Sequence, residues 1–342
     1  MLLSVALLVA ALAILILGAD KLVGATEQIG LALGIPPFIM GITVLAVGTS
    51  LPELVTAMVA VSQGSPEMVA GTAIGSSIAN ILLILGVAAI VAKELKLNWD
   101  LLHGDLPVLF GSLLLLGFVA YPVSDADWLL FNEIQPLVDR ERMATGQLAI
   151  ISRGEGMILI IGYFLYLYYY AGRSKEMKSE DVPEAKVGWK QMMWLVVGGA
   201  GTMLGADWTV AAASDIATSM GLGQEIVAAS LVAIGTSLPE LVVSINAARR
   251  NNVEMAVGNV TGSNIFNIFM VIGVPAVAAP SMASGVSLPI GMSSTLMLQI
   301  PFYSVAVVLF LVIVLDKVLT RTEGLILLLA YTLFIGKLFS FF

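Results

Sequence analysis

Two glutamates in matching sequence settings have the clearest chemistry. The segment GTSLPE occurs twice, ending at Glu53 and at Glu240. In each copy two hydroxyl residues stand three and four positions before the glutamate, so on a helix their oxygens share the carboxylate's face. These residues are Thr49, Ser50, Thr236 and Ser237. Each copy therefore offers a carboxylate and two hydroxyls, which suit a hard cation.

The same motif contains a proline that disturbs a helix. Pro52 and Pro239 lack the amide hydrogen that a helix uses, and the glycine before them in each copy tolerates irregular backbone. We expect each helix to break or bend there and to free carbonyl oxygens about one turn upstream, which in hydrocarbon need a partner such as a cation. These are the carbonyls of Ala46 and Ala233.

A second polar element follows each glutamate and carries a serine 23 residues after it. It reads GTAIGSSIANILLILG in the first half and GNVTGSNIFNIFMVIG in the second. Its serine and asparagine are four apart and share a helix face, as Ser76 with Asn80 and Ser263 with Asn267. Its glycine pairs let helices approach closely. Packed against the GTSLPE helices, these elements would complete an oxygen-lined cavity.

Carboxylates in the bilayer core mark an ion pathway, because each costs at least roughly 2.5 kcal/mol there. Two glutamates balance one Ca²⁺, and no Lys or Arg lies within the motif segments. A bound cation or a proton must then neutralise them, and protons should compete with metal as the pH falls.

Simpler roles stay open for the same residues. The glutamates could lie at helix ends in headgroup water. A hydroxyl in a membrane helix often bonds the carbonyl four residues back and then needs no ion. Asn80 and Asn267 could instead link helices by hydrogen bonds. For Asp20 and Asp207, near helix ends, we expect an interfacial or structural role, with gating as the lesser alternative.

The composition places these motifs in a bilayer. Of the 342 residues, 58% are hydrophobic and 12% are charged, with a mean hydropathy of +0.98. The chain has no cysteine and one histidine, His103, which excludes disulfides, thiolate zinc sites and histidine clusters. A net charge of −8 argues against nucleic-acid binding. Inorganic cations and lipid are the partners we expect.

The apolar runs predict an all-α integral membrane protein with ten transmembrane helices, starting near residues 2, 38, 66, 105, 155, 191, 225, 253, 299 and 322. A charged linker at 173–190 separates five helices in 1–172 from five in 191–342. Twelve of the sixteen Lys and Arg residues fall on the linker's side of the membrane. Because such residues concentrate in the cytoplasm, we expect a cytoplasmic linker, both termini outside, and a plasma (inner) membrane location.

The sequence repeats internally, and the first three helices of each half correspond. One ungapped offset of 187 residues relates Glu53 to Glu240, Ser76 to Ser263 and Asp20 to Asp207. A weaker echo joins RGEGMILIIGYFLYL to RTEGLILLLAYTLFI at an offset of 168. Five helices is an odd number, so the second copy enters the membrane from the opposite side. Inverted repeats with interrupted helices are typical of transporters whose site lies near the midplane.

These motifs resemble the alpha repeats of the sodium/calcium exchanger family within the calcium/cation antiporters. The resemblance covers almost the whole chain, with repeat motifs at about 38–92 and 225–279, and rests on AVGTSLPE, AIGTSLPE and GNVTGSNIFNI. It implies a prokaryotic-type antiporter, not an enzyme, that exchanges several Na⁺ for one Ca²⁺ by alternating access. It implies no cofactor and no protein partner. The implied ligands are Glu53, Glu240, Thr49, Ser50, Ser76, Thr236, Ser237, Ser263 and the carbonyls of Ala46 and Ala233.

The first repeat departs from the family pattern. Thr72 and Ser77 stand where the family usually has Asn. Asn267 stands where members similar to potassium-dependent exchangers have Asp, which weakens the case for K⁺ cotransport. The linker is also too short for a large calcium-sensing domain.

The main alternative function is a calcium/proton exchanger that uses the glutamates as proton carriers, and sodium dependence separates the two. A channel fits inverted halves with broken helices less well. An intramembrane enzyme lacks support, because neither HExxH nor a phosphate-binding glycine loop is present.

Overall fold

The computed structural model describes residues 2–63, 67–92, 94–96, 104–120, 148–151, 153–176, 187–220, 235–278, 288–291, 294–315 and 317–339. Within this part of the chain the helices fall into ten units, which confirms the predicted all-α membrane architecture. The predicted start of the seventh helix near 225 and most of the linker lie outside the described residues.

The first half contains five helical units. They are α1 (Leu2–Leu33), α2–η1–α3 (Pro37–Met40, Gly41–Leu45 and Ala46–Ser62), α4–η2–α5 (Glu67–Ile78, Ala79–Ile84 and Leu85–Ala92), α6 (Asp105–Ala120) and α9 (Arg153–Glu176). The η segments are π-helical, with wider turns than the α-helices that flank them.

The second half repeats this order. Its units are α10 (Trp189–Ser219), α12 (Leu238–Arg249), α13–η4–α14 (Val253–Phe266, Asn267–Val271 and Gly273–Ala278), α15 (Ser294–Val314) and α16 (Arg321–Leu338). Of the described units, five are long and apolar enough to cross a membrane: Leu3–Leu33, Pro37–Ser62, Met68–Ala92, Trp189–Ser219 and Val253–Ala278.

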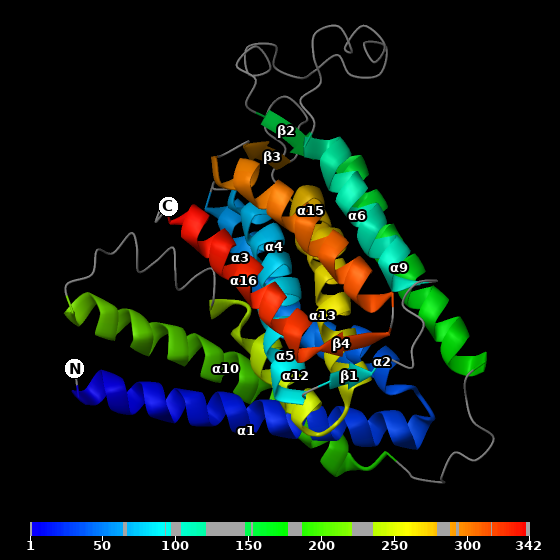
Figure 1. Cartoon of the computed structure of the whole chain (residues 1–342), viewed down its shortest axis with the longest axis vertical. Helices are drawn as coiled ribbons and strands as arrows, with labels where there is room; N and C mark the ends of the chain where they lie inside the picture. Colours follow the sequence, from blue (N-terminus) through cyan, green and yellow to red (C-terminus); the bar gives the residue numbers. More distant parts are fainter. Residues whose placement is uncertain are drawn as a thin grey trace, which may run out of the picture.

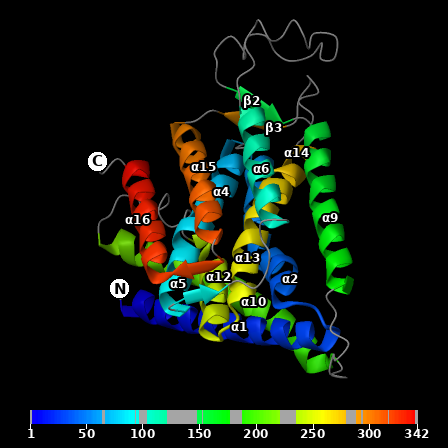
Figure 2. The same ribbon diagram turned by 45° about the vertical axis from the view of Figure 1, so that its right-hand side comes forward.

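Helices α1 and α10 form a pair that lies at a steep angle to the other helices (Figures 1 and 2). Glycines let the two backbones approach closely. A Cβ atom on Gly18 would lie 2.6 Å from the backbone nitrogen of Thr202, and one on Gly198 would lie 2.6 Å from that of Leu22. Any larger residue at either glycine would force the pair apart.

The last helix of each repeat packs on the third unit of the other repeat. A Cβ atom on Gly324 of α16 would lie 2.8 Å from the carbonyl oxygen of Gly86 on α5. One on Gly156 of α9 would lie 2.9 Å from the carbonyl oxygen of Gly273 on α14. Gly86 corresponds to Gly273 at the offset of 187, and Gly156 to Gly324 at the offset of 168. The same glycine contact therefore occurs twice, once for each repeat, between residues related by the two sequence offsets.

Two short strand pairs show the inversion directly. Strand β1 (Glu94–Lys96) pairs antiparallel with β4 (Val318–Thr320), and β2 (Leu148–Ile151) with β3 (Leu288–Gly291). β1 and β3 each follow the third unit of their repeat, whereas β2 and β4 each precede the fifth. The two pairs lie towards opposite ends of the upright helices in Figure 1. Equivalent segments at opposite ends are what an inverted repeat requires.

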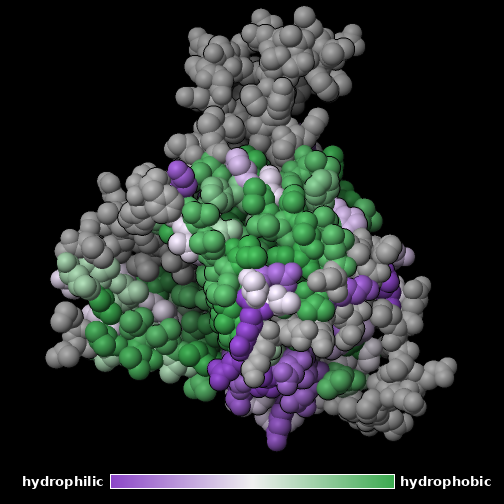
Figure 3. All heavy atoms as spheres, viewed as in Figure 1, coloured by the Kyte–Doolittle hydropathy of each residue, from purple (hydrophilic) through white to green (hydrophobic). Residues whose placement is uncertain are grey.

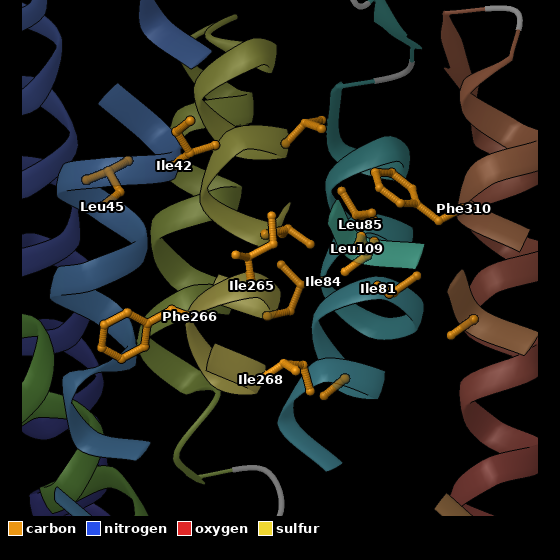
Figure 4. Packing of buried hydrophobic residues seen from close by; sticks show 14 of the residues in the cluster. Ile42, Leu45, Ile81, Ile84, Leu85, Leu109, Ile265, Phe266, Ile268 and Phe310 are labelled. Carbon is orange, nitrogen blue, oxygen red and sulfur yellow. The ribbon is translucent and has the colours of Figure 1, made fainter. Parts of the chain in front are cut away.

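The core is built around α13, whose residues from Met255 to Phe266 are all buried. Figure 4 shows Ile265 of α13 and Ile84 of η2 in the space between their two ribbons, with Ile42 of η1 beyond α13. Hydrophobic residues cover much of the outer surface in the view of Figure 3, and hydrophilic ones gather towards the lower end. An apolar belt with polar residues gathered at one end fits a protein that faces lipid.

Candidate cation-binding site

The two GTSLPE copies interrupt their helices in different ways. In the first half the irregular backbone lies just upstream, where Gly41–Leu45 is π-helical and the amide of Ala46 bonds the carbonyl of Gly41. Helix α3 then continues through Pro52. In the second half Thr236 and Ser237 form a turn, and α12 begins at Leu238 with a proline in its first turn. The break expected at the motif is therefore found only in the second half. In the first half the prediction of a break is wrong, because α3 accommodates Pro52 without a break and the irregular backbone lies upstream at Gly41–Leu45.

Both carboxylates are fully buried and hydrogen-bonded to serines. The Ser50 hydroxyl donates to Glu240 Oε1 at 2.9 Å, and the Ser76 hydroxyl donates to Glu53 Oε1 at 3.2 Å. The hydroxyl oxygens of Ser76 and Ser237 are 3.0 Å apart. Ser50 belongs to one repeat and Glu240 to the other, and the same is true of Ser76 and Ser237. The two half-sites therefore form one polar centre across the repeat interface.

Several buried oxygens of the predicted ligands lack a hydrogen-bond partner within the described structure. They are Oε2 of Glu53, Oε2 of Glu240, Oδ1 of Asn80, Oγ of Ser263 and Oδ1 of Asn267. A buried acceptor without a partner is unfavourable by about 1–3 kcal/mol, and more when it is charged. Among the described residues neither glutamate forms an ion pair with Lys or Arg. This donor set fits a hard cation with oxygen ligands.

The number of carboxylates limits what such a site can hold. No cluster of three or more His, Asp or Glu able to hold a metal occurs among the described residues. Hydroxyl, carboxamide and backbone oxygens would have to complete the coordination shell around Glu53 and Glu240. Those are the residue types that the motifs supply.

Some predicted ligands also make the simpler contacts considered for them. The Thr49 hydroxyl lies 3.0 Å from the carbonyl oxygen of Leu45 and 3.4 Å from that of Ala46, so it can bond back to its own helix. Nδ2 of Asn80 donates to Oδ1 of Asn264 at 3.4 Å and links two helices. Each residue still has an oxygen that could bind a cation. On Thr49 it is the hydroxyl lone pair, and on Asn80 it is Oδ1, which has no hydrogen-bond partner in the described structure.

The remaining predicted residues differ in how well they are placed. Ser263 and Asn267 are fully buried on α13 and η4. Thr236 is half-buried in the turn before α12. Ala233 lies outside the described residues, so its predicted carbonyl has no described position.

Asp20 stands apart from this centre. Its carboxylate is 2.6 Å from Nη2 of Arg250, and Nη1 of the same arginine is 3.8 Å from Glu27. This ion pair joins α1 to the end of α12, which supports the structural role expected for Asp20.

Three buried polar residues beside the site were not among the predicted ligands. Asn259 accepts from Thr49 at 3.3 Å and donates to Ser244 at 3.0 Å, and Asn264 accepts from Asn80. The sequence held a signal for two of them. At the offset of 187, Asn259 and Asn264 correspond to Thr72 and Ser77, the positions where the first repeat departs from the family pattern.

The chain matches a known family over nearly its full length. The family model described as sodium/calcium exchanger protein matches residues 3–171 and 190–339. The sodium/calcium exchanger MaX1 of Methanosarcina acetivorans is 28% identical over 97% of this chain and 97% of its own. The vacuolar cation/proton exchanger 3 of Oryza sativa is 25% identical over 94% of this chain and 77% of its own.

Solved structures agree with this match. A structure of the sodium-calcium exchanger NCX_Mj aligns with a TM-score of 0.75 and 28% sequence identity, over 99% of this chain and 99% of that one. The ten-helix fold, the paired carboxylates at the repeat interface and the matched family model all lead to the same assignment. The chain belongs to the sodium/calcium exchanger family, and it is an integral membrane ion exchanger rather than an enzyme.

Proposed function

We propose that this protein is a sodium/calcium antiporter in which Na⁺ and Ca²⁺ compete for the centre around Glu53 and Glu240. The observation that carries the proposal is the hydrogen bond from Ser50 to Glu240, which joins the two repeats at the carboxylates. Two negative charges without a basic partner in the described structure match one Ca²⁺. Several Na⁺ can replace it, because they too bind carboxylate, hydroxyl and carbonyl oxygens.

The proposed ligands are those expected from the motifs. Glu53 and Glu240 supply charge, and Ser50, Ser76 and Ser237 supply hydroxyl oxygens. Ser50 and Ser76 also hydrogen-bond the carboxylates, and Ser237 contacts Ser76. Oxygens of Thr49, Thr236, Ser263, Asn80 and Asn267, with the carbonyls of Ala46 and Ala233, complete the shell. We assign 1–172 and 191–342 as the two inverted repeats, with 173–190 as the linker between them.

A proton-coupled cation exchanger is the second candidate. The similarity to the vacuolar cation/proton exchanger 3 of rice favours it, because that protein is named for proton exchange. Buried carboxylates can carry protons as well as metal. The coupling ion therefore has to be measured.

The test uses purified protein in liposomes loaded with Na⁺ and diluted into Na⁺-free medium containing ⁴⁵Ca²⁺. We expect uptake that requires the Na⁺ gradient and falls to the level of empty liposomes in Glu53→Gln and in Glu240→Gln. The control is Thr209→Val, which removes a buried hydroxyl bonded to the carbonyl of Gly205 on α10. Uptake driven only by a pH gradient would favour the proton exchanger, and wild-type uptake in both glutamine variants would refute the site.

We also propose that the linker is cytoplasmic, with both termini outside and the protein in the plasma (inner) membrane. Two contacts support the assignment of basic residues from different segments to one side of the membrane. Arg250 forms an ion pair with Asp20, which is next to Lys21, and Lys96 pairs with Val318, which is next to Lys317. The chain has no cysteine, so single cysteines can report sidedness. In intact cells an impermeant maleimide should label Ser340→Cys but not Ser179→Cys, and the reverse pattern would invert the topology.

A further inference from the structure

Asn259 connects the two motif helices although it belongs to neither. It is fully buried on α13. Its Oδ1 accepts from the Thr49 hydroxyl of α3 at 3.3 Å, and its Nδ2 donates to the Ser244 hydroxyl of α12 at 3.0 Å. Thr49 lies four residues before Glu53, and Ser244 lies four residues after Glu240. One carboxamide therefore spans the turns that adjoin the two carboxylates.

The orientation of this carboxamide determines what Thr49 can do. Ser244 takes the NH₂ group, so the carbonyl oxygen of Asn259 faces Thr49. The Thr49 hydroxyl also has other acceptors, which are the backbone carbonyls of Leu45 and Ala46 and the carboxylate of Glu240. Its proton points to Asn259 or to one of these. With its proton directed to these acceptors, the Thr49 oxygen presents its lone pairs to a cation.

The first half lacks the same bridge. At the offset of 187, Asn259 corresponds to Thr72 and Ser244 to Ala57. Ala57 has no hydroxyl, and a threonine has no carboxamide that could donate at one end and accept at the other. Both residues of the bridge are therefore replaced in the first half. Thr236, which corresponds to Thr49, is half-buried in a turn. The two GTSLPE motifs are alike in sequence, but among the described residues only Thr49 of the first motif is hydrogen-bonded to such a bridge.

We propose that Asn259, held by Ser244, is a positioning residue that orients the Thr49 hydroxyl for cation binding and so sets the affinity of the site for Ca²⁺. This inference rests on the proposed function, because it assumes that Thr49 is a ligand. Neither Asn259 nor Ser244 hydrogen-bonds a carboxylate in the described structure. Loss of the bridge between Asn259 and Ser244 should weaken cation binding while leaving the serine contacts of Glu53 and Glu240 intact.

The experiment measures equilibrium binding of ⁴⁵Ca²⁺ to purified protein, which does not depend on the coupling ion. Asn259→Thr installs the residue found at the equivalent position of the first half, and Ser244→Ala likewise installs the equivalent alanine. Each variant should weaken Ca²⁺ binding about three- to tenfold, the range expected for one lost hydrogen bond. Ser244→Thr keeps the hydroxyl and should bind like the wild type, which a purely steric role would not predict.

A double-mutant cycle tests whether the effect passes through Thr49. Thr49→Val should weaken binding by itself, and adding Asn259→Thr should change it by less than about twofold, because the two substitutions remove one interaction. Effects that multiply, or wild-type affinity in both Asn259→Thr and Ser244→Ala, would overturn the proposal. If Asn259→Thr does not fold, the Ser244 pair still decides the question. Wild-type protein that binds no Ca²⁺ would refute the proposed function itself, and this role with it.

Discussion

The hydroxyl of Ser50 donates to the carboxylate of Glu240 at 2.9 Å and so crosses the interface between the two repeats. Its own repeat contains Glu53 three residues later, yet the carboxylate that it serves belongs to the other half. A contact of this kind depends on the relative position of the two repeats. The state of the site and the arrangement of the repeats are therefore linked.

Ser50→Ala should weaken Ca²⁺ binding more than any substitution of an exposed serine. A hydrogen bond to a charged group contributes about 1.5–3 kcal/mol, so we expect a loss of about ten- to a hundredfold in affinity. Ser62→Ala is the matched control, because Ser62 is exposed at the end of the same helix and bonds its own backbone. Equal ⁴⁵Ca²⁺ binding by the two variants would contradict this role.

Gly262→Ala should destabilise the protein through steric overlap. A Cβ atom there would lie 2.6 Å from Cα of Ile42 and 2.7 Å from Cβ of Ala46, and a forced repacking of this kind costs about 1–3 kcal/mol. Gly172→Ala meets no atom within 4 Å and serves as the control. In a thermal unfolding scan in detergent we expect a lower midpoint only for Gly262→Ala, by roughly 2 to 10 °C. A wild-type midpoint would mean that α13 can move away from η1.

Tyr166→Phe should also lower the unfolding midpoint. The phenol of Tyr166 donates to Oδ1 of Asp105 at 2.8 Å, and Tyr170 donates to Oδ2 of the same buried carboxylate. Losing one donor to a buried carboxylate costs about 1–3 kcal/mol. Tyr168→Phe is the comparison, because Tyr168 lies on the same helix and is 79% exposed. If the two variants have the same unfolding midpoint, the hydrogen bond from Tyr166 of α9 to Asp105 of α6 adds little to stability.

The ion pair between Asp20 and Arg250 should contribute little by itself. Both side chains are partly exposed, at 42% and 35%, and pairs of this kind contribute about 0–1 kcal/mol. Asp20→Asn should therefore shift the midpoint by no more than about 4 °C, and the shift should shrink in high salt. The charge-reversed double variant Asp20→Arg/Arg250→Asp should recover part of the loss. A large shift that salt does not change would point to packing instead.

The sequence by itself determined the class of the protein, the number of helices and the repeat. Ten apolar runs predicted ten helices, and a helix satisfies its own backbone hydrogen bonds, so these features are local. Five of the described helical units are long and apolar enough to cross a bilayer. The offset of 187 residues identified Glu53 and Glu240, because a polar motif that recurs in apolar helices has no packing reason to do so. The glycines at the contacts between third and last helices also recur in the sequence, at the offset of 187 for Gly86 and Gly273 and of 168 for Gly156 and Gly324.

Only the tertiary structure decided which polar atoms meet. Helical spacing placed Ser50 beside Glu53, but packing gives its proton to Glu240. Asn259 reaches Thr49 across 210 residues, and the strand pairs join segments from different repeats. The π-helical turn at Gly41–Leu45 lies where Gly258 and Gly262 of α13 press against that backbone. Such contacts depend on the distance and angle between segments far apart in the chain, and spacing along one helix carries no information about either.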